Sequence, residues 1–191
     1  MKLEYTITRP KQKFIQTVDN KGGTGSKKSK NCFSAGKVMA TVFWDSHGVI
    51  LIDYLQKGKT LTGAYYASLL DKLKNEIAEK RSHLQKKKIL FHQDNAPSHT
   101  SAFARAKIHE LRFELLDHLP YSPDLAPSDF FLFFQLKIAL GGQRFSSNEE
   151  ANTFVNDYFA EKKAEYYLDG LKRWEHRWDK CVEQQGDYVD K

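Results

Sequence analysis

Two aspartates, Asp94 and Asp129, have the clearest potential for chemistry in this sequence. Asp94 follows the short apolar run 88–91, which is typical of a buried strand, and Asp129 follows Pro127, where a segment with an apolar face begins as a helix would. One carboxylate at a strand end and one in a first helical turn can converge on a divalent cation. Mg²⁺ takes oxygen ligands, usually one or two carboxylates with water and substrate phosphate, so the pair favours a nuclease or phosphoryl-transfer site. For either aspartate taken alone, the commoner role is that of a turn former or a partner of the helix dipole.

The sequence segments around both aspartates resemble those of a known family. The segments HQDNAPSHT and LPYSPDLAPSDFFLF, with 34 residues between Asp94 and Asp129, resemble the two downstream catalytic motifs of the mariner branch of the Tc1/mariner DNA transposases. The transposase half of a SET methyltransferase–mariner fusion is similar in the same way. The resemblance covers residues 35–190 and continues through three further segments: KVMATVFWDSHGVILIDYLQKGKTLTG, GGQRF and RWDKCVEQQGDY.

The resemblance implies a fold and a function. The fold is α/β, an RNase H-like mixed sheet flanked by helices, and the site is a triad of acidic residues that binds two Mg²⁺ or Mn²⁺ ions. Asp94 matches the second acid and Asp129 the third, each as a catalytic residue and metal ligand. The implied activity is endonuclease cleavage and strand transfer during DNA transposition and integration. Transposon ends and target DNA are the implied partners, with a homodimer possible and the nucleus as the location.

The first acid of the family has no match in this sequence. It lies in an Asp-Glu-aromatic motif on the first strand, just upstream of a Tyr-Thr-x-x-basic segment that residues 5–11 echo. No Asp-Glu pair and no helix-turn-helix region precede residue 45, so we expect an N-terminally truncated catalytic domain whose first strand is largely missing or replaced. Such a chain would be defective in cleavage. The alternative is a non-catalytic, nucleic-acid-binding or dimerising relic of a transposase.

Two other acids could replace the missing one. Asp45 begins the connection Asp-Ser-His-Gly between two apolar runs, where Asp and Gly are ordinary turn residues, so we interpret it as a turn former. Glu4 lies on an alternating stretch, residues 3–8, that is typical of a strand and that we expect to fill the slot of the first strand. Asp124 is the alternative to Asp129 within its motif, and we expect it to cap or turn.

Composition fits a basic, single-domain protein. The 191 residues are 13% aromatic and carry a net charge of +6, which favours a polyanionic partner such as nucleic acid. Only two cysteines occur, without metal-ligand spacing, and no apolar run is long enough for a membrane helix or a signal peptide. We divide the chain into a basic, partly irregular N-terminal segment (1–36) and the transposase catalytic domain (37–191).

Five residues are candidates for contact with nucleic acid. Lys27, Lys28 and Lys30 lie in a Gly-rich basic loop and are expected to bind DNA phosphate. Asn95 and His99 are expected to shape the loop after the strand that ends at Asp94, or to contact DNA phosphate. His92, Asp94 and His99 together could instead be zinc ligands, but their spacing matches no known zinc framework.

The pattern of apolar residues predicts a mixed sheet with helices. Residues 38–44 and 49–55 form an antiparallel hairpin, and a helix capped by Thr62 follows with Tyr66, Leu69, Leu70, Leu73 and Ile77 on its buried face. Further elements are a helix at 98–111, a strand at 113–116, a helix after Pro127, a helix with a capping box at 146–150, and a final helix with an apolar stripe of Leu168, Leu171, Trp174, Trp178, Cys181 and Val182.

Overall fold

A five-stranded mixed sheet forms the centre of the molecule. The computed structural model describes residues 5–14, 38–85 and 87–189. The strand order is β3-β2-β1-β4-β5, with β1 antiparallel to β2 and parallel to β4, and β4 parallel to β5. The mixed α/β sheet expected from the sequence is therefore confirmed. Its strands are β1 (Tyr5–Phe14), β2 (Val38–Asp45), β3 (Gly48–Leu55), β4 (Ile89–His92) and β5 (Phe113–Leu116).

The central position is occupied by β1. Its backbone pairs with β2 from Thr6 opposite Asp45 to Phe14 opposite Val38, so the strand extends beyond the predicted stretch 3–8. The expectation of irregular structure after residue 8 is thus wrong for residues 9–14. Pro10 cannot donate a ladder hydrogen bond, but the pairing register shifts between Pro10 and Gln12, where a proline is tolerated. Glu4 lies outside the described residues.

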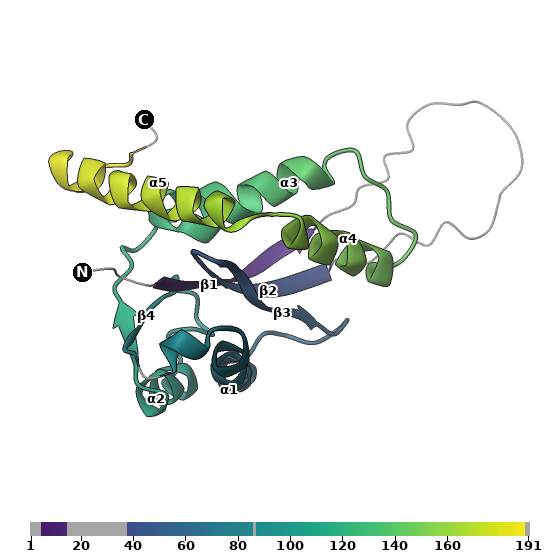
Figure 1. Cartoon of the computed structure of the whole chain (residues 1–191), viewed down its shortest axis with the longest axis horizontal. Helices are drawn as coiled ribbons and strands as arrows, with labels where there is room; N and C mark the ends of the chain where they lie inside the picture. The colour runs from purple at the N-terminus through teal and green to yellow at the C-terminus, as the bar shows by residue number, and fades with distance from the viewer. Residues whose placement is uncertain (1–4, 15–37, 86, 190–191) are drawn as a thin grey trace, which may run out of the picture.

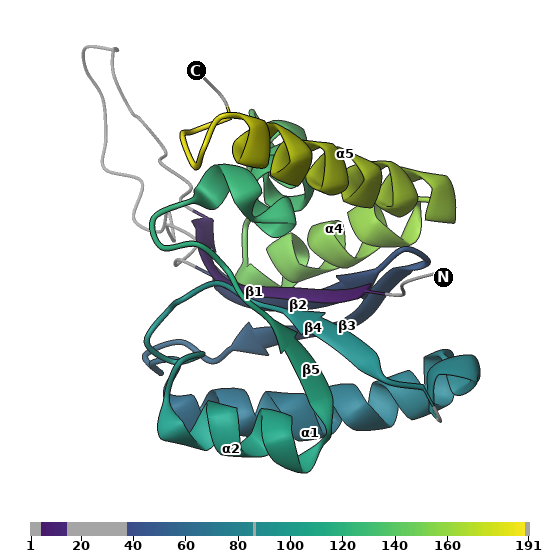
Figure 2. The same ribbon diagram turned by 90° about the vertical axis from the view of Figure 1, so that its left-hand side faces the viewer.

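One face of the sheet is covered by α1 (Gly63–Lys80) and α2 (Ala102–Glu110), as Figures 1 and 2 show. Thr62 caps α1 as predicted, because its Oγ1 accepts a hydrogen bond from the Tyr65 amide (3.2 Å). The predicted buried face of this helix is confirmed, with all five apolar residues at most 1% exposed. A short helix, η1 (Ser82–Leu84), follows α1.

The opposite face is covered by α3 (Phe134–Leu140), α4 (Asn148–Ala160) and α5 (Ala164–Glu183), which lie above the sheet in Figure 2. The predicted capping box at the start of α4 is present. Ser147 Oγ accepts from the Glu150 amide, and Glu150 in turn accepts from Ser146. The second hydrophobic core lies between this face of the sheet and α3, α4 and α5. Trp174 is 6% exposed in this second core, so it is a packing residue as expected.

Two predicted elements differ from the structure. The helix expected at 98–111 begins only at Ala102, because Ser101 is the residue that caps it, its Oγ accepting from the Ala104 amide (3.2 Å). In α5, Leu168 is 43% and Val182 74% exposed, so these two residues lie off the buried stripe. The helix instead buries Tyr167 and Gly170, which face the sheet and η3.

Candidate active site

Asp94 lies two residues beyond the end of β4 and is held by the loop that follows it. Its Oδ1 accepts a hydrogen bond from the Ala96 amide (3.1 Å) and lies 2.6 Å from Nδ1 of His99. The side chain is 16% exposed, so one edge of the carboxylate region remains open to the surface. The loop fixes Asp94 in position without enclosing it.

His99 is fully buried, with its ring packed against the ring of Tyr66 on α1 at a centroid distance of 4.3 Å. The Tyr66 hydroxyl donates to Gln93 Oε1 (2.9 Å), and Gln93 Nε2 donates to the backbone carbonyl of His99 (3.2 Å). This network ties the loop to the core. His99 therefore shapes the loop, as one of its two predicted roles requires. The other role is corrected, because a ring with 0% exposure offers no surface to a DNA phosphate.

Asp129 lies in η3 (Ser128–Phe133), where the sequence predicted an ordinary helix start after Pro127. The segment is a π-helical turn, a rare form that is frequently found at functional sites. Ser128 anchors this turn, because its Oγ accepts from Nε1 of Trp44 on β2 (3.0 Å), and the Asp129 amide donates to the Ala126 carbonyl (2.8 Å). Both carboxylate oxygens of Asp129 are shielded from solvent.

The turn that carries Asp129 and the strand that leads to Asp94 both contact the central strand. The η3 turn that carries Asp129 contacts β1, and β1 pairs in parallel with β4, with Ile7 opposite His92 just before Asp94. The fold therefore brings the two elements with the candidate acids to the same strand, although 34 residues separate them in the sequence.

Asp124, the alternative to Asp129, has a structural role. It lies in the short helix η2 (Pro123–Leu125) and is 8% exposed. Its Oδ2 accepts from the Val189 amide (3.0 Å), and its backbone carbonyl accepts from Arg177 on α5 (3.1 Å). Asp124 thus ties the C-terminal segment to the loop ahead of η3.

Asp45 is likewise held by structural contacts. Its Oδ1 accepts from the His47 amide (2.9 Å) in the hairpin turn, as expected of a turn former. Arg81 Nε and Nη2 donate to its two oxygens at 2.7 and 3.0 Å, and the side chain is 4% exposed. A carboxylate fully engaged by a guanidinium cannot act as the missing acid. Lys27, Lys28 and Lys30, the predicted DNA contacts, lie outside the described residues.

His92 is buried in the second core, and its ring makes edge contacts with Trp174 (4.9 Å) and His118 (5.2 Å). Burial, helped by the neighbouring His118, lowers the pKa of His92 to about 3, so the ring is neutral at physiological pH. Across the described ranges, no group of three or more His, Cys, Asp or Glu residues is arranged to hold a metal ion, so the zinc alternative is not supported.

Asn95 bridges two loops at the surface. Its Nδ2 donates to the backbone carbonyl of His118 (2.9 Å), which links the loop after β4 to the segment after β5. The side chain is exposed, so a role in contacting DNA stays a prediction.

The sequence reading missed the network beneath Asp94. Tyr66 was assigned to the core for its apolar ring, and Gln93 received no role. The one available signal was Gln93 itself, a polar residue directly after a buried strand, since buried polar groups need hydrogen-bond partners.

The donor chemistry of the pair fits a divalent cation. Carboxylate oxygens are the ligands that Mg²⁺ and Mn²⁺ prefer, and Asp94 Oδ1 is already oriented by two donors, as metal-binding carboxylates usually are. In the part of the chain that the structure describes, no helix is long and apolar enough to cross a membrane.

The chain is similar to several known proteins. Residues 11–87 match the family model described as a transposase with a partial DDE domain. The chain is 40% identical to the mariner Mos1 transposase of Drosophila mauritiana over 156 residues, which are 81% of this chain and 45% of that protein. It is 34% identical to the human histone-lysine N-methyltransferase SETMAR over 156 residues, 81% of this chain and 23% of the relative. The chain thus spans less than half the length of these curated relatives.

Solved structures match over nearly the whole chain. The Mos1 transposase catalytic domain with raltegravir and Mn is 36% identical, with a TM-score of 0.81, 96% of this chain covered and 84% of that chain. A Mos1 paired-end complex with the left transposon end is 35% identical, with a TM-score of 0.80, 96% of this chain covered and 56% of that chain.

Proposed function

Because this chain belongs to the mariner family of DNA transposases and has the RNase H-like fold of their catalytic domain, we propose that Asp94 and Asp129 are its ligands for Mg²⁺ or Mn²⁺ in phosphoryl transfer on DNA. The observation that carries the proposal is the placement of these two acids on elements that flank the central strand β1. Mos1 structures that contain Mn or Mg support the choice of metal.

The chain's own residues would hold and orient the reacting groups. When bound, the divalent ions activate water and stabilise charge on the phosphoryl oxygens. His99 and the Ala96 amide fix one oxygen of Asp94, and the contact between Trp44 and Ser128 anchors the turn that carries Asp129. Rigid placement matters because an error of about 1 Å in a reacting group can cost about 10²-fold in rate.

DNA is the proposed substrate, both transposon ends and target. Mos1 structures hold a transposon end, and this chain carries a net charge of +6. We place the protein in the nucleus, where such a substrate lies, and a homodimer would bring two ends together.

One observation favours a second, non-catalytic function. In the described ranges no third acid joins Asp94 and Asp129, since no metal-holding group of three carboxylates or imidazoles is found there. The 191-residue chain would then bind DNA, or a second copy of itself, without efficient cleavage.

The metal site itself is tested by measuring Mn²⁺ binding to the 191-residue chain with electron paramagnetic resonance. We expect Asp94→Asn and Asp129→Asn each to weaken Mn²⁺ binding by more than about tenfold. Replacing a residue that only hydrogen-bonds to a metal ligand already costs about that much, and a ligand itself should cost more. Asp157→Asn, an exposed aspartate on α4, is the matched control and should bind as the unaltered chain does. Unchanged Mn²⁺ affinity in both site variants would refute the metal assignment.

A further inference from the structure

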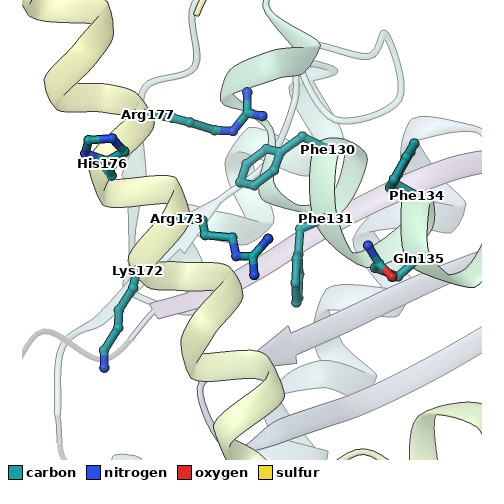
Figure 3. A pocket seen from close by; sticks show the side chains of 8 residues that line it. All are labelled: Phe130, Phe131, Phe134, Gln135, Lys172, Arg173, His176 and Arg177. Carbon is teal, nitrogen blue, oxygen red and sulfur yellow. The ribbon is translucent and has the colours of Figure 1, made fainter. Parts of the chain in front are cut away.

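A shallow groove of about 470 Å³ lies between the η3–α3 segment and α5 (Figure 3). One wall is aromatic and the other is basic. The two walls come from segments about forty residues apart in the sequence, which pack together in the second core. The aromatic wall consists of Phe130, Phe131 and Phe134, and the basic wall of Lys172, Arg173 and Arg177.

The two guanidinium groups of the basic wall are held in place. Arg177 donates to the backbone carbonyl of Asp124 (3.1 Å), and its guanidinium lies over the ring of Phe130 at 4.3 Å. Arg173 Nε donates to Asp169 (2.8 Å), one turn away on α5 and outside the groove lining. No acidic residue lines the groove, so its field is positive and suits an anion. Planar guanidinium groups in fixed positions suit phosphate in particular.

The aromatic wall leaves one ring open. Phe130 is covered by Arg177, and Phe131 is 5% exposed. Phe134 is 53% exposed, although exposed aromatic rings are costly in water. An exposed ring beside fixed cations is the arrangement of proteins that bind single-stranded nucleic acid, where bases stack on aromatic rings and phosphates meet Lys and Arg.

The groove wall and the candidate active site share η3, where Phe130 directly follows Asp129. We propose that this groove binds an unpaired segment of DNA strand, with phosphate on Lys172, Arg173 and Arg177 and a base stacked on Phe134. The proposal rests on the proposed function in taking DNA as the substrate, and it adds the strand form that is bound and the residues that bind it. The volume of the groove falls in the range of about 300–1,000 Å³ that is typical of sites for small ligands, and this size suits one nucleotide unit.

Fluorescence anisotropy with labelled dT12, a single-stranded oligothymidylate, tests the proposal on the full chain without divalent metal. Lys172→Gln/Arg173→Gln removes two exposed charges. The slope of log affinity against log salt should fall by about 1.4, since each lost phosphate contact on a single strand is worth about 0.7. Lys59→Gln/Arg105→Gln, which removes two exposed charges elsewhere, is the matched control and should keep the original slope.

A second variant isolates stacking. Phe134→Leu should weaken dT12 binding by about tenfold, in line with base–aromatic stacking in other single-strand binders. Its affinity for an abasic 12-mer should equal that of the unaltered chain, because the abasic strand has phosphates but no base. An equal loss on both oligonucleotides would overturn the stacking assignment.

Three further outcomes discriminate among explanations. An unchanged salt slope in Lys172→Gln/Arg173→Gln overturns the groove as a phosphate site. Displacement of dT12 by an oligoglutamate peptide as effectively as by unlabelled dT12 would assign the groove to an acidic protein and also overturn the proposal. Because metal is absent, failure of the Mn²⁺ experiment with normal dT12 binding would refute the proposed catalytic site and leave the groove intact.

Discussion

Nδ1 of His99 lies 2.6 Å from Oδ1 of Asp94, while the His99 ring is itself fully buried against Tyr66. The position of a partly buried carboxylate is thereby fixed by a core residue. Since α1 carries Tyr66 and β4 leads into Asp94, the packing of helix on sheet determines where this candidate metal ligand lies.

The first prediction is that His99 positions Asp94. His99→Ala should lower the free energy of unfolding by about 2–4 kcal/mol, because it leaves a cavity and removes a hydrogen bond to a carboxylate. It should also weaken Mn²⁺ binding by about tenfold, as loss of an outer partner of a metal ligand does. Urea unfolding and Mn²⁺ titration measure the two effects.

A conservative variant separates positioning from stability. The amide of His99→Asn can place a donor near the site of Nδ1, so Mn²⁺ affinity should recover even though the smaller side chain leaves part of the cavity. Asn95→Ala, at an exposed position in the same loop, is the control for general loop effects. If Asn restores stability but not metal affinity, His99 is a packing residue only.

The second prediction concerns the Arg81–Asp45 ion pair, whose side chains are 14% and 4% exposed. Arg81→Met should destabilise the protein by about 3–5 kcal/mol, because it leaves a buried carboxylate without its counter-charge. Asp45→Asn should cost less, since the amide oxygen can still accept from the His47 amide. Thermal or urea unfolding measures both. As a control, Lys88→Met breaks a pair with Glu114 whose side chains are 71% and 40% exposed, and it should change stability by no more than about 1 kcal/mol.

Local patterns predicted the parts of this fold that depend on nearby residues. The hairpin at the Asp45 turn and the buried face of α1 follow from alternation and helical spacing, both of which are read within one element. The extension of β1 past Pro10 did not follow, because it depends on a register shift against β2, a partner strand more than twenty residues away. Tertiary pairing overrode the local signal there.

Resemblance to the family motifs supplied Asp94 and Asp129 as candidate site residues, but the sequence did not predict the residues that support them. The buried position of His99 could not be seen in the sequence, because a histidine in a polar loop looks exposed until α1 is packed over it. The hydrogen bond that anchors η3 likewise comes from Trp44, a residue on a distant strand.

The third prediction concerns pH. His92 has a pKa of about 3 in the folded protein against 6.5 for an ordinary histidine, so the unfolded chain binds more protons between these values. The contribution of His92 to the free energy of unfolding is therefore complete above about pH 6.5. It falls by about 1.4 kcal/mol per pH unit as the pH drops toward 3. Urea unfolding between pH 7 and 4.5 measures this slope.

His92→Phe should flatten that pH dependence, because a phenyl ring fills much of the same space beside Trp174 and does not titrate. His176→Phe, at an exposed histidine on α5, is the matched control and should leave the slope unchanged. An identical slope for His92→Phe and the unaltered chain would show that His92 is not the group responsible.

The last prediction is that the 191-residue chain does not cleave DNA efficiently. Asp94 and Asp129 are the two candidate ligands among the described residues, and two carboxylates hold a pair of divalent ions poorly, so we expect a cost greater than the roughly 10²-fold that a misplacement of about 1 Å causes. The test incubates the chain with DNA that carries mariner-type ends in Mg²⁺ or Mn²⁺. A second protein carries, at its N-terminus, the Asp-Glu-aromatic strand and DNA-binding region of a family member. We expect product only from the extended protein, and none when Asp94→Ala is introduced into it.

Metal-dependent nicking by the 191-residue chain that disappears with Asp94→Ala would contradict the prediction. Glu4 would then be the next residue to replace, since Asp45 is already engaged by Arg81.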